Sequence, residues 1–438
     1  MPRHLPAEPE TGTVDALNHD GEGVVHAGKT AFVPGALPGE RVVFLRRKRF
    51  RSHDEAELRE VLEPSALRVT PECAHFALCG GCALQHLSGA QQVQIKQQQL
   101  RDNLLRLGRV EPEQWLAPIT ADIWRYRRRA RLGARYVHRR ERSLVGFRER
   151  QGSFIAAIDG CEVLAEPANR LIAPLSALLT SLSIRERLPQ IELAVAENLT
   201  ALVLRVLDPP TDADRAALQA FEGEHGVRLY LQSKGLDSVV PLTPPAPPLE
   251  YTLPAFDVRL QFLPTDFVQV NAAINRQLVA RVIELLQLDG TARVLDLYCG
   301  LGNFSLPLAR RAAQVVAVEG EAGLVERARG NARLNGLTNA EFHVANLMAP
   351  EALEAGWWRG PYSHVLLDPP RAGAREVLEK VARLRPRRLA YVSCHPATLA
   401  RDLGLLVHEH GFRLLACGVA DMFPHTAHIE SLALLEPK

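Results

Sequence analysis

The sequence predicts a multidomain α/β protein, and three observations lead to that prediction. Its 438 residues suffice for about three domains, since one domain typically holds roughly 150 residues. Residues 8–68 contain short strand-like runs separated by turn residues, which is typical of a small OB-like β-barrel. From residue 261 onward, short β-rich runs alternate with helical stretches, which predicts a Rossmann-like, mainly parallel sheet. We therefore expect domains at 8–68, 69–260 and 261–438, the middle one of mixed α+β structure.

The middle region has fewer clear signals than the two ends of the chain. Residues 69–90 are rich in turn formers, and the helical composition that follows predicts a helical segment at about 91–120 that packs on the C-terminal domain. Six prolines crowd into residues 241–254, which indicates a semi-rigid linker close to a domain boundary.

The composition is that of a folded protein. Hydrophobic residues make up 47% and charged residues 23%, which excludes a disordered chain and a disulfide-dense mini-protein. The longest uncharged apolar stretch, residues 171–184, is too short to cross a bilayer, and residues 1–10 lack a hydrophobic signal core. We therefore expect a cytoplasmic protein without a membrane partner.

Positive charge is concentrated in two segments, although the net charge is only +2. Residues 41–51 hold six basic residues and no acid, and residues 125–142 hold nine arginines against one acid. Because Lys and Arg supply most non-specific affinity for nucleic acids, these segments indicate a polyanionic partner. A single charge run is more often a solvated surface, but Trp124, Tyr126 and Tyr136 add stacking faces of the kind used to bind single-stranded RNA.

The C-terminal domain contains a candidate cofactor site. Its predicted strands are 293–297, 315–318, 341–344, 364–367 and 389–392. Ligands of such sheets bind at the carboxyl ends of the strands, where glycines let them approach the backbone and an acid can bind ribose hydroxyls. Gly300 and Gly302 follow the first strand and Glu319 ends the second. Ser305 replaces the third glycine of a dinucleotide site, so the pattern favours S-adenosylmethionine over NAD.

Two further motifs follow the fourth and fifth predicted strands. Asp368-Pro369-Pro370-Arg371 is suited to presenting polar groups to a planar base, and Cys394 is suited to attack on a pyrimidine ring. Most cysteines are inert buried thiols, which is our interpretation of Cys299 and Cys417. His425 and His428 lack an evident third metal ligand, so we interpret them as structural or substrate-lining residues.

Three cysteines predict a metal or cluster site in the middle region. Cys73, Cys79 and Cys82 have the spacing C-x5-C-x2-C, and Cys161 can complete a set of four. Close cysteines in a cytosolic chain are more often metal or cluster ligands than disulfide partners. Thiolates serve both zinc and iron–sulfur centres, so the spacing leaves the choice open.

Taken together, these motifs resemble those of the 23S ribosomal RNA (uracil-5-)-methyltransferases of the TRAM-containing, iron–sulfur type, over nearly the whole chain. The matching motifs are residues 21–23 and 31–40, the four cysteines, Phe267-Val268-Gln269-Val270-Asn271, Asp368-Pro369-Pro370-Arg371, Ser393-Cys394-His395-Pro396 and residues 423–430. The resemblance implies that residues 8–68 form a TRAM domain, an OB-like RNA binder, and that 261–438 form an S-adenosylmethionine-dependent methyltransferase domain.

The resemblance also implies roles for individual residues. Cys394 is expected to be the nucleophile and Glu430 the general base. Residues expected to line the cofactor site are Gln269, Tyr298, Asn303, Glu319, Asn346 and Asp368. Tyr298 departs from the family, which often has Phe there. Expected ligands of a [4Fe-4S] cluster are Cys73, Cys79, Cys82 and Cys161.

The implied substrate is 23S ribosomal RNA, with uridine 1939 flipped out of a single-stranded or loop region as the expected target of a monomeric enzyme. Relatives that modify uridine 747 commonly lack the TRAM part, and those that modify tRNA generally lack both the TRAM part and the cluster. A non-catalytic RNA-binding assembly factor is the alternative from another class, against which the intact Cys394 and Glu430 argue. A cytosine-5 methyltransferase typically has Cys after the Pro of the fourth-strand motif, whereas Arg371 follows Pro370 here.

Overall fold

The computed structural model describes residues 8–150 and 152–438, which divide into two compact units. The first unit contains the chain through Gln99 together with Arg148–Phe154 and Phe423–His428, and the second contains the rest. Residues 69–99 therefore belong with the N-terminal barrel, although the expected boundary lies at 68/69. The division into three domains stays a prediction.

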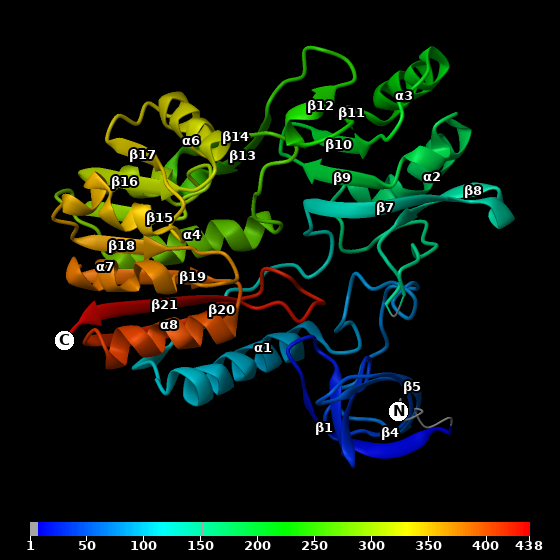
Figure 1. Cartoon of the computed structure of the whole chain (residues 1–438), viewed down its shortest axis with the longest axis horizontal. Helices are drawn as coiled ribbons and strands as arrows, with labels where there is room; N and C mark the ends of the chain where they lie inside the picture. The colour runs from blue at the N-terminus through cyan, green and yellow to red at the C-terminus, as the bar shows by residue number, and fades with distance from the viewer. Residues whose placement is uncertain (1–7, 151) are drawn as a thin grey trace. The chain divides into compact units, whose positions relative to one another are not determined.

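The N-terminal barrel forms as the turn pattern predicts. Its strands are β1 (Glu10–Leu17), β2 (Gly23–Ala27), β3 (Lys29–Val33), β4 (Arg41–Arg49) and β5 (Asp54–Glu63), closed in the order β1-β2-β3-β5-β4 (Figure 1). Alternate residues of these strands point inward, which is the period-2 pattern of a half-buried strand. Their side chains build a small apolar core, which includes Val14, Val25, Ala31, Val42 and Phe44.

Much of the first basic segment is neutralised by ion pairs between strands of this barrel. β4 pairs antiparallel with the acidic β5, so that Arg41 lies opposite Glu63 and Lys48 opposite Glu55. Arg46 is buried and donates to Asp54 at 3.0 Å. The segment therefore consists largely of cross-strand ion pairs, and its positive charge is less available to a polyanion than composition indicates.

A buried carboxylate, Glu40, closes one end of the barrel. Its oxygens accept hydrogen bonds from the backbone amides of Leu37 at 2.8 Å and Ser65 at 3.2 Å, and from the Arg68 guanidinium at 2.5 and 2.7 Å. Burial by itself would raise the pKa of Glu40, but the bonds from Arg68 and the two amides outweigh it and the pKa is lowered. The side chain therefore binds the chain beyond β5 to the turn before β4.

The first sheet of the second unit has six strands in the order β12-β11-β10-β9-β7-β8. Their bounds are β7 (Arg129–Val137), β8 (Arg142–Gly146), β9 (Gln190–Val195), β10 (Thr200–Arg205), β11 (Val227–Gln232) and β12 (Val239–Pro241). β10 and β11 are parallel and are joined through α3 (Asp212–His225), whose N-terminus is closed by a capping box from Thr211. The apolar stretch 171–184 forms α2 (Ile172–Ser181), whose buried face includes Leu175 and Leu179.

The second sheet has eight strands in the order β17-β16-β15-β18-β19-β21-β20-β6 (Figure 1). Its strands are β6 (Gln114–Trp115), β15 (Arg293–Leu297), β16 (Gln314–Glu319), β17 (Ala340–Val344), β18 (His364–Leu367), β19 (Arg388–Ser393), β20 (Phe412–Ala420) and β21 (Glu430–Pro437). The predicted strands form within one residue at each end, and β15 to β19 are parallel. β21 runs antiparallel between β19 and β20, an arrangement that the sequence analysis did not predict.

The remaining helices are α1 (Gly89–Asn103), which continues into a π-helical turn at Leu104–Gly108, α4 (Ala272–Leu286), α5 (Ser305–Ala309), α6 (Ala322–Leu334), α7 (Leu378–Arg383) and α8 (Pro396–His408). Of these, α1 and α4 precede β15 in the chain, and α5 to α8 lie between the strands from β15 to β20. The proline-rich segment leads into a hairpin of β13 (Leu249–Leu253) and β14 (Val258–Phe262). In the described part of the chain, no helix has the length and apolarity needed to cross a membrane.

We predict that Glu40→Ala destabilises the barrel by roughly 3–5 kcal/mol, because it leaves the Arg68 charge and two amides without their acceptor. The control Glu57→Ala breaks an exposed pair with Arg47 and should cost less than about 1 kcal/mol. Hydrogen exchange of barrel peptides in the full chain measures both. Since the pKa of Glu40 is lowered from 4.5, its contribution should be present above that pH and vanish as the pH falls below it. Equal protection in both variants would contradict this account of Glu40.

Candidate active site

A strained turn follows β15 at the carboxyl edge of the eight-stranded sheet. Tyr298 has φ 67°, and Gly300 and Gly302 have φ 56° and 99°, so three of five consecutive residues lie in the left-handed region that favours glycine. The amides of Tyr298 and Cys299 both donate to the carbonyl of Val318, at 2.8 and 3.1 Å. These bonds hold the turn against the neighbouring strand β16.

Glu319 stabilises this turn through its side chain. Its carboxylate accepts hydrogen bonds from the amides of Gly300 at 3.1 Å, Gly320 at 2.7 Å and Glu321 at 3.0 Å. The side chain is half-buried at the end of β16. Oε1 accepts two of these bonds and Oε2 only one, so Oε2 keeps a lone pair for a further donor such as a hydroxyl. The sequence analysis predicted its place beside the glycine turn.

Asn303 belongs to a small amide network in the second unit. It exchanges two hydrogen bonds of 2.9 Å with Asn275, and its Oδ1 also accepts the Tyr251 hydroxyl at 3.0 Å. Tyr251 and Asn275 line a pocket with Gln269, Arg128 and other residues. Neither was predicted from the sequence; Asn275 lies one helical turn after the Phe267–Asn271 motif, which was the available signal.

Two acids with raised pKa values lie at the ends of adjacent strands. Burial raises the pKa of Asp296, in β15, to about 7, against a hydrogen bond from Ser305 and with a contribution from Glu319. Burial likewise raises the pKa of Asp368, after β18, to about 7, with contributions from Asp296 and Glu319. Among the described residues Asp296 Oδ1 has no hydrogen-bond partner. The three carboxyl groups thus form one acidic cluster whose charges repel.

The candidate nucleophile, Cys394, and the candidate base, Glu430, both interact with Asp368 of this cluster. Cys394 directly follows β19, and Glu430 begins β21, whose next residue Ser431 pairs with Ser393. Burial raises the pKa of the Cys394 thiol to about 11, helped by Glu430 and Asp368 and opposed by Arg371. Glu430 is 3% exposed, and burial together with Asp368 raises its pKa well above the usual value.

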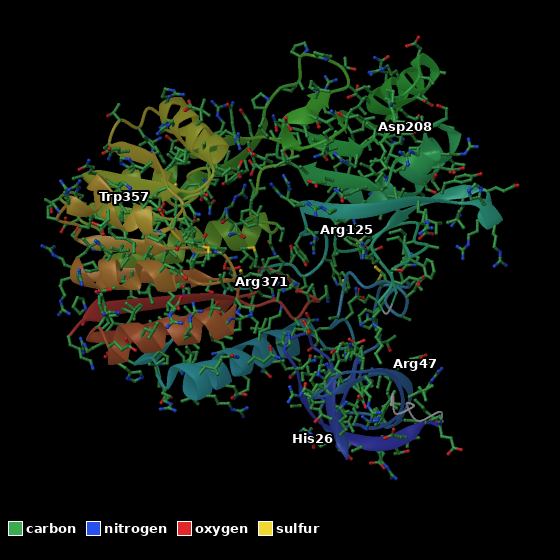
Figure 2. The ribbon with its side chains drawn as sticks, viewed as in Figure 1. His26, Arg47, Arg125, Asp208, Trp357 and Arg371 are labelled. Atoms are coloured by element: carbon green, nitrogen blue, oxygen red, sulfur yellow. The ribbon has the colours of Figure 1, made fainter. Side chains whose placement is uncertain are left out.

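Arg371, labelled in Figure 2, lies at the edge where β18 and β19 end. Its side chain is exposed, and it is the one cation that opposes the raised pKa of the Cys394 thiol. Asn346 follows β17 at the same edge, exposed, with Oδ1 accepting the Met348 amide at 3.1 Å. Five of the six predicted cofactor residues therefore lie at or after the carboxyl end of a strand of this sheet. The exception is Gln269, which precedes α4.

The cysteines of the middle region fall into both units. Cys73, Cys79 and Cys82 lie in the first unit and Cys161 in the second. Burial raises the pKa of Cys79, as does Cys73, while a hydrogen bond from Gly81 and the charge of Arg150 oppose the shift. Within the described residues no three His, Cys, Asp or Glu side chains are grouped so as to hold a single metal ion. Cys299 and Cys417 are buried, as their interpretation as inert thiols requires.

Arg150 is a neighbour of the three cysteines that the sequence analysis missed. Its guanidinium donates to the carbonyls of Phe76 at 2.8 Å and Cys82 at 2.9 Å and stacks on the Phe76 ring, with its carbon 4.4 Å from the ring centre. Its charge also interacts with Cys79 and Cys82. It lies far from them in sequence, so no local signal could have found it.

The second basic segment is partly neutralised as well. Arg125, Arg128 and Arg131 form ion pairs with glutamates of the same unit, and Arg129 is largely buried. Exposed arginines remain at the β7–β8 hairpin: Arg135, Arg139, Arg140 and Arg142. The positive surface of this segment is therefore concentrated at the tip of the hairpin.

The fold and this edge define the class of protein. A parallel sheet with a glycine turn after its first strand, an acid ending the second and an Asp-Pro-Pro turn after the fourth is an α/β methyltransferase domain. A family model described as tRNA (Uracil-5-)-methyltransferase matches residues 89–357 and 358–438. The chain belongs to this family.

Full-length relatives support the same family. A Nitrosococcus oceani protein named 23S rRNA (uracil(1939)-C(5))-methyltransferase RlmD is 49% identical, over 99% of this chain and 97% of its own length. The Methylococcus capsulatus protein of that name is 50% identical, over 99% and 98%. The solved structure of Pyrococcus abyssi tRNA (uracil-54, C5)-methyltransferase, in complex with S-adenosyl-L-homocysteine, has a TM-score of 0.76 and 26% identity, over 97% of this chain and 100% of that chain. The predicted fold class and family are thereby confirmed.

We predict that Asp368→Asn stabilises the second unit, because it removes a buried charge. A folded-state pKa of about 7 against a model value of 3.8 means that stability is lost as the pH rises from about 4 through about 7. The gain should grow over that window to on the order of 1–4 kcal/mol and then level off. Denaturant unfolding between pH 4 and 8 measures it, with the exposed Asp237→Asn as control. A gain that does not depend on pH would contradict the raised pKa.

Proposed function

We propose that this protein transfers a methyl group from S-adenosylmethionine to C5 of uridine 1939 in 23S ribosomal RNA. The observation that carries the proposal is the grouping of a thiol, Cys394, with the carboxyl groups of Glu430 and Asp368 at one strand edge. The names of the relatives, which match nearly end to end at about half identity, support the choice of substrate. An rRNA substrate fits a cytoplasmic enzyme, which we propose acts as a monomer.

The residues at the sheet edge fit S-adenosylmethionine. The unpartnered Oδ1 of Asp296 and the mutually repelling acids Asp368 and Glu319 favour a ligand with positive charge and hydroxyl donors. We propose that Gln269, Tyr298, Asn303, Glu319, Asn346 and Asp368 line its site. When bound, S-adenosylmethionine supplies the methyl group as a sulfonium cation. Tyr298 brings an extra hydroxyl, which is buried and unpartnered among the described residues.

We propose that Cys394 and Glu430 act at different steps of the reaction at the uracil ring. C5 is a poor nucleophile until a thiolate adds to C6 and converts the ring into an enolate. We propose that Cys394 makes this addition. C5 can then form a bond to the methyl carbon while the bond from that carbon to the sulfonium sulfur breaks, which leaves S-adenosylhomocysteine. Glu430 then removes the C5 proton, and elimination restores the Cys394 thiolate and the double bond.

The raised pKa values determine when this chemistry can begin. A thiol with a pKa of about 11 is mostly protonated at neutral pH, and burial shifts the pKa of Glu430 in the direction that favours its protonated form. A positive charge brought among the acids favours the ionised form of each. Deprotonation of Cys394 and Glu430 is therefore favoured once a cationic ligand occupies the edge, with Arg371 assisting the thiolate.

The uridine must leave its stack to reach this edge, at a cost of a few kcal/mol. We propose that the exposed arginines of the β7–β8 hairpin contact RNA phosphates, since they are the part of the second basic segment without ion pairs in the described structure. Methylation of tRNA is the alternative that the Pyrococcus abyssi structure and the family description raise. Parallel assays on a 23S rRNA fragment and on tRNA distinguish the two, and the absence of methylation in both would favour a non-catalytic RNA binder.

We also propose that Cys73, Cys79, Cys82 and Cys161 hold a [4Fe-4S] cluster. The donor set fits, because such clusters are bound by four cysteine thiolates. A cluster takes its thiolates at the corners of a cube of atoms, so it does not require them to converge on one ion. Arg150 fits as well, since a guanidinium beside Cys79 and Cys82 offsets the negative charge that bound thiolates carry.

We predict that Cys394 and Glu430 variants fail in different ways. Cys394→Ala should form no adduct and no product, whereas Glu430→Gln should accumulate a methylated protein–RNA covalent complex, with turnover lowered ~10²- to 10⁴-fold. Denaturing electrophoresis with substrate RNA and S-adenosylmethionine measures the complex. Cys417→Ala, a buried thiol in β20, should behave as wild type. A trapped band from Cys394→Ala, or normal turnover by Glu430→Gln, would show that the roles are assigned wrongly.

We predict that anaerobically purified protein contains one [4Fe-4S] cluster and that Cys79→Ala loses it. Iron and acid-labile sulfide analysis, together with charge-transfer absorbance, measures the cluster. Cys417→Ala, the control for a buried thiol outside the set, should keep full iron and sulfide. Stoichiometric zinc in place of iron in the wild-type protein would refute the proposal.

A further inference from the structure

Helix α1 buries two long polar side chains in the first unit. Gln92 is 0% exposed and Lys96 is 1% exposed. They are four residues apart and therefore lie on the same face of the helix. Burying an amide or an ammonium group is costly unless it forms hydrogen bonds, so the partners of these two side chains indicate what they do.

Both side chains bind the segment Phe423–His428. Gln92 Oε1 accepts the backbone amide of His425 at 2.7 Å, and Gln92 Nε2 lies 3.2 Å from the ring Nδ1 of the same residue. Lys96 Nζ donates to the carbonyl of Phe423 at 2.9 Å. One helical face thus holds the segment at two points that are two residues apart.

The segment is held in a conformation that it would not favour alone. His425 has φ 65°, which is uncommon for a residue with a side chain. Its carbonyl accepts the amides of Ala83 and Leu84 at 2.7 and 2.9 Å. Gln92 Nε2 also donates to the carbonyls of Leu84 and Leu87, at 3.1 and 2.9 Å. A single buried amide therefore joins the helix, the turn before it and the strained residue.

This segment is the connection from β20 to β21, and it ends two residues before Glu430. Glu430 begins β21 and pairs with Ala420 of β20, so the connection between these two strands leads directly into the candidate base. We infer that Gln92 and Lys96 are positioning residues for the general base Glu430, which they influence through the backbone of Phe423–His428. The inference rests on the proposed function, in which Glu430 removes the C5 proton.

A positioning role predicts a particular defect. A misplacement of about 1 Å can cost roughly 10²-fold in rate. If only the base is displaced, Cys394 still adds and the methyl group still transfers, so the methylated covalent complex accumulates. A purely structural role predicts loss of folded protein instead, with the remaining molecules turning over normally.

The test uses Gln92→Met and Lys96→Met in the full chain, since Met keeps the length of each side chain and removes its hydrogen bonds. We expect kcat to fall about 10²-fold with little change in KM, and the covalent complex to appear on denaturing gels as it does for Glu430→Gln. Gln99→Met is the matched control, because Gln99 on the same helix donates to the carbonyl of Asn18 in the barrel at 3.0 Å. It should leave kcat and the gel unchanged.

The outcomes separate this inference from the proposed function. A trapped complex in Glu430→Gln but not in Gln92→Met or Lys96→Met overturns the inference alone. No trapped complex in Glu430→Gln overturns the role of Glu430, and the inference with it. If Gln92→Met fails to fold, Lys96→Met gives the same decision, because it removes the bond to the Phe423 carbonyl. Trapping in Gln99→Met as well would assign the defect to general loosening of α1 and overturn the inference.

Discussion

Mutual repulsion of buried acids governs the carboxyl edge of the eight-stranded sheet. Asp296, Asp368 and Glu430 are each protonated more readily than an exposed carboxyl, first because they are buried and then because they face one another. Replacing some of these acids would stabilise the fold, since burying a charge without a partner costs free energy. Their presence together is understandable if a positively charged ligand enters among them. After burial, Glu430 and Asp368 also raise the pKa of the Cys394 thiol.

The sheet holds these groups together by strand direction rather than by direct side-chain contacts. The ends of β15 and β18 and the residue after β19 lie at one edge because these strands are parallel. β21 runs the opposite way, so the residue that begins it, Glu430, lies at that same edge. A sixth parallel strand in its place would have put its first residue at the far edge. The antiparallel strand is therefore what brings a base to the thiol of Cys394.

Local signals predicted most of the fold and part of the site. The short apolar runs of β15, β16, β18 and β19 were predictable because nearly all their residues are buried. The turns and acids that follow them were predictable from strand order. β6, with two residues, and the amide network of Tyr251 and Asn275 depend on contacts far apart in sequence, which no local pattern reports. The basic segments show the same limit: composition counts the charges of β4, but only the register with β5 shows that they are paired.

Helix α1 illustrates why buried polar groups are the hardest residues to interpret from sequence. A run of glutamines around Lys96 has the composition of a solvent-exposed helix, yet Gln92 and Lys96 are among the most buried polar side chains of the described chain. Each forms a hydrogen bond with a backbone group more than 300 residues away in sequence. Such bonds resist water only when every partner is in place, so they make one loop conformation much more favourable than its alternatives. A buried general base requires a fixed loop, because the base must first lie within hydrogen-bond reach of the proton that it removes. Only then does the pKa of the base affect the rate.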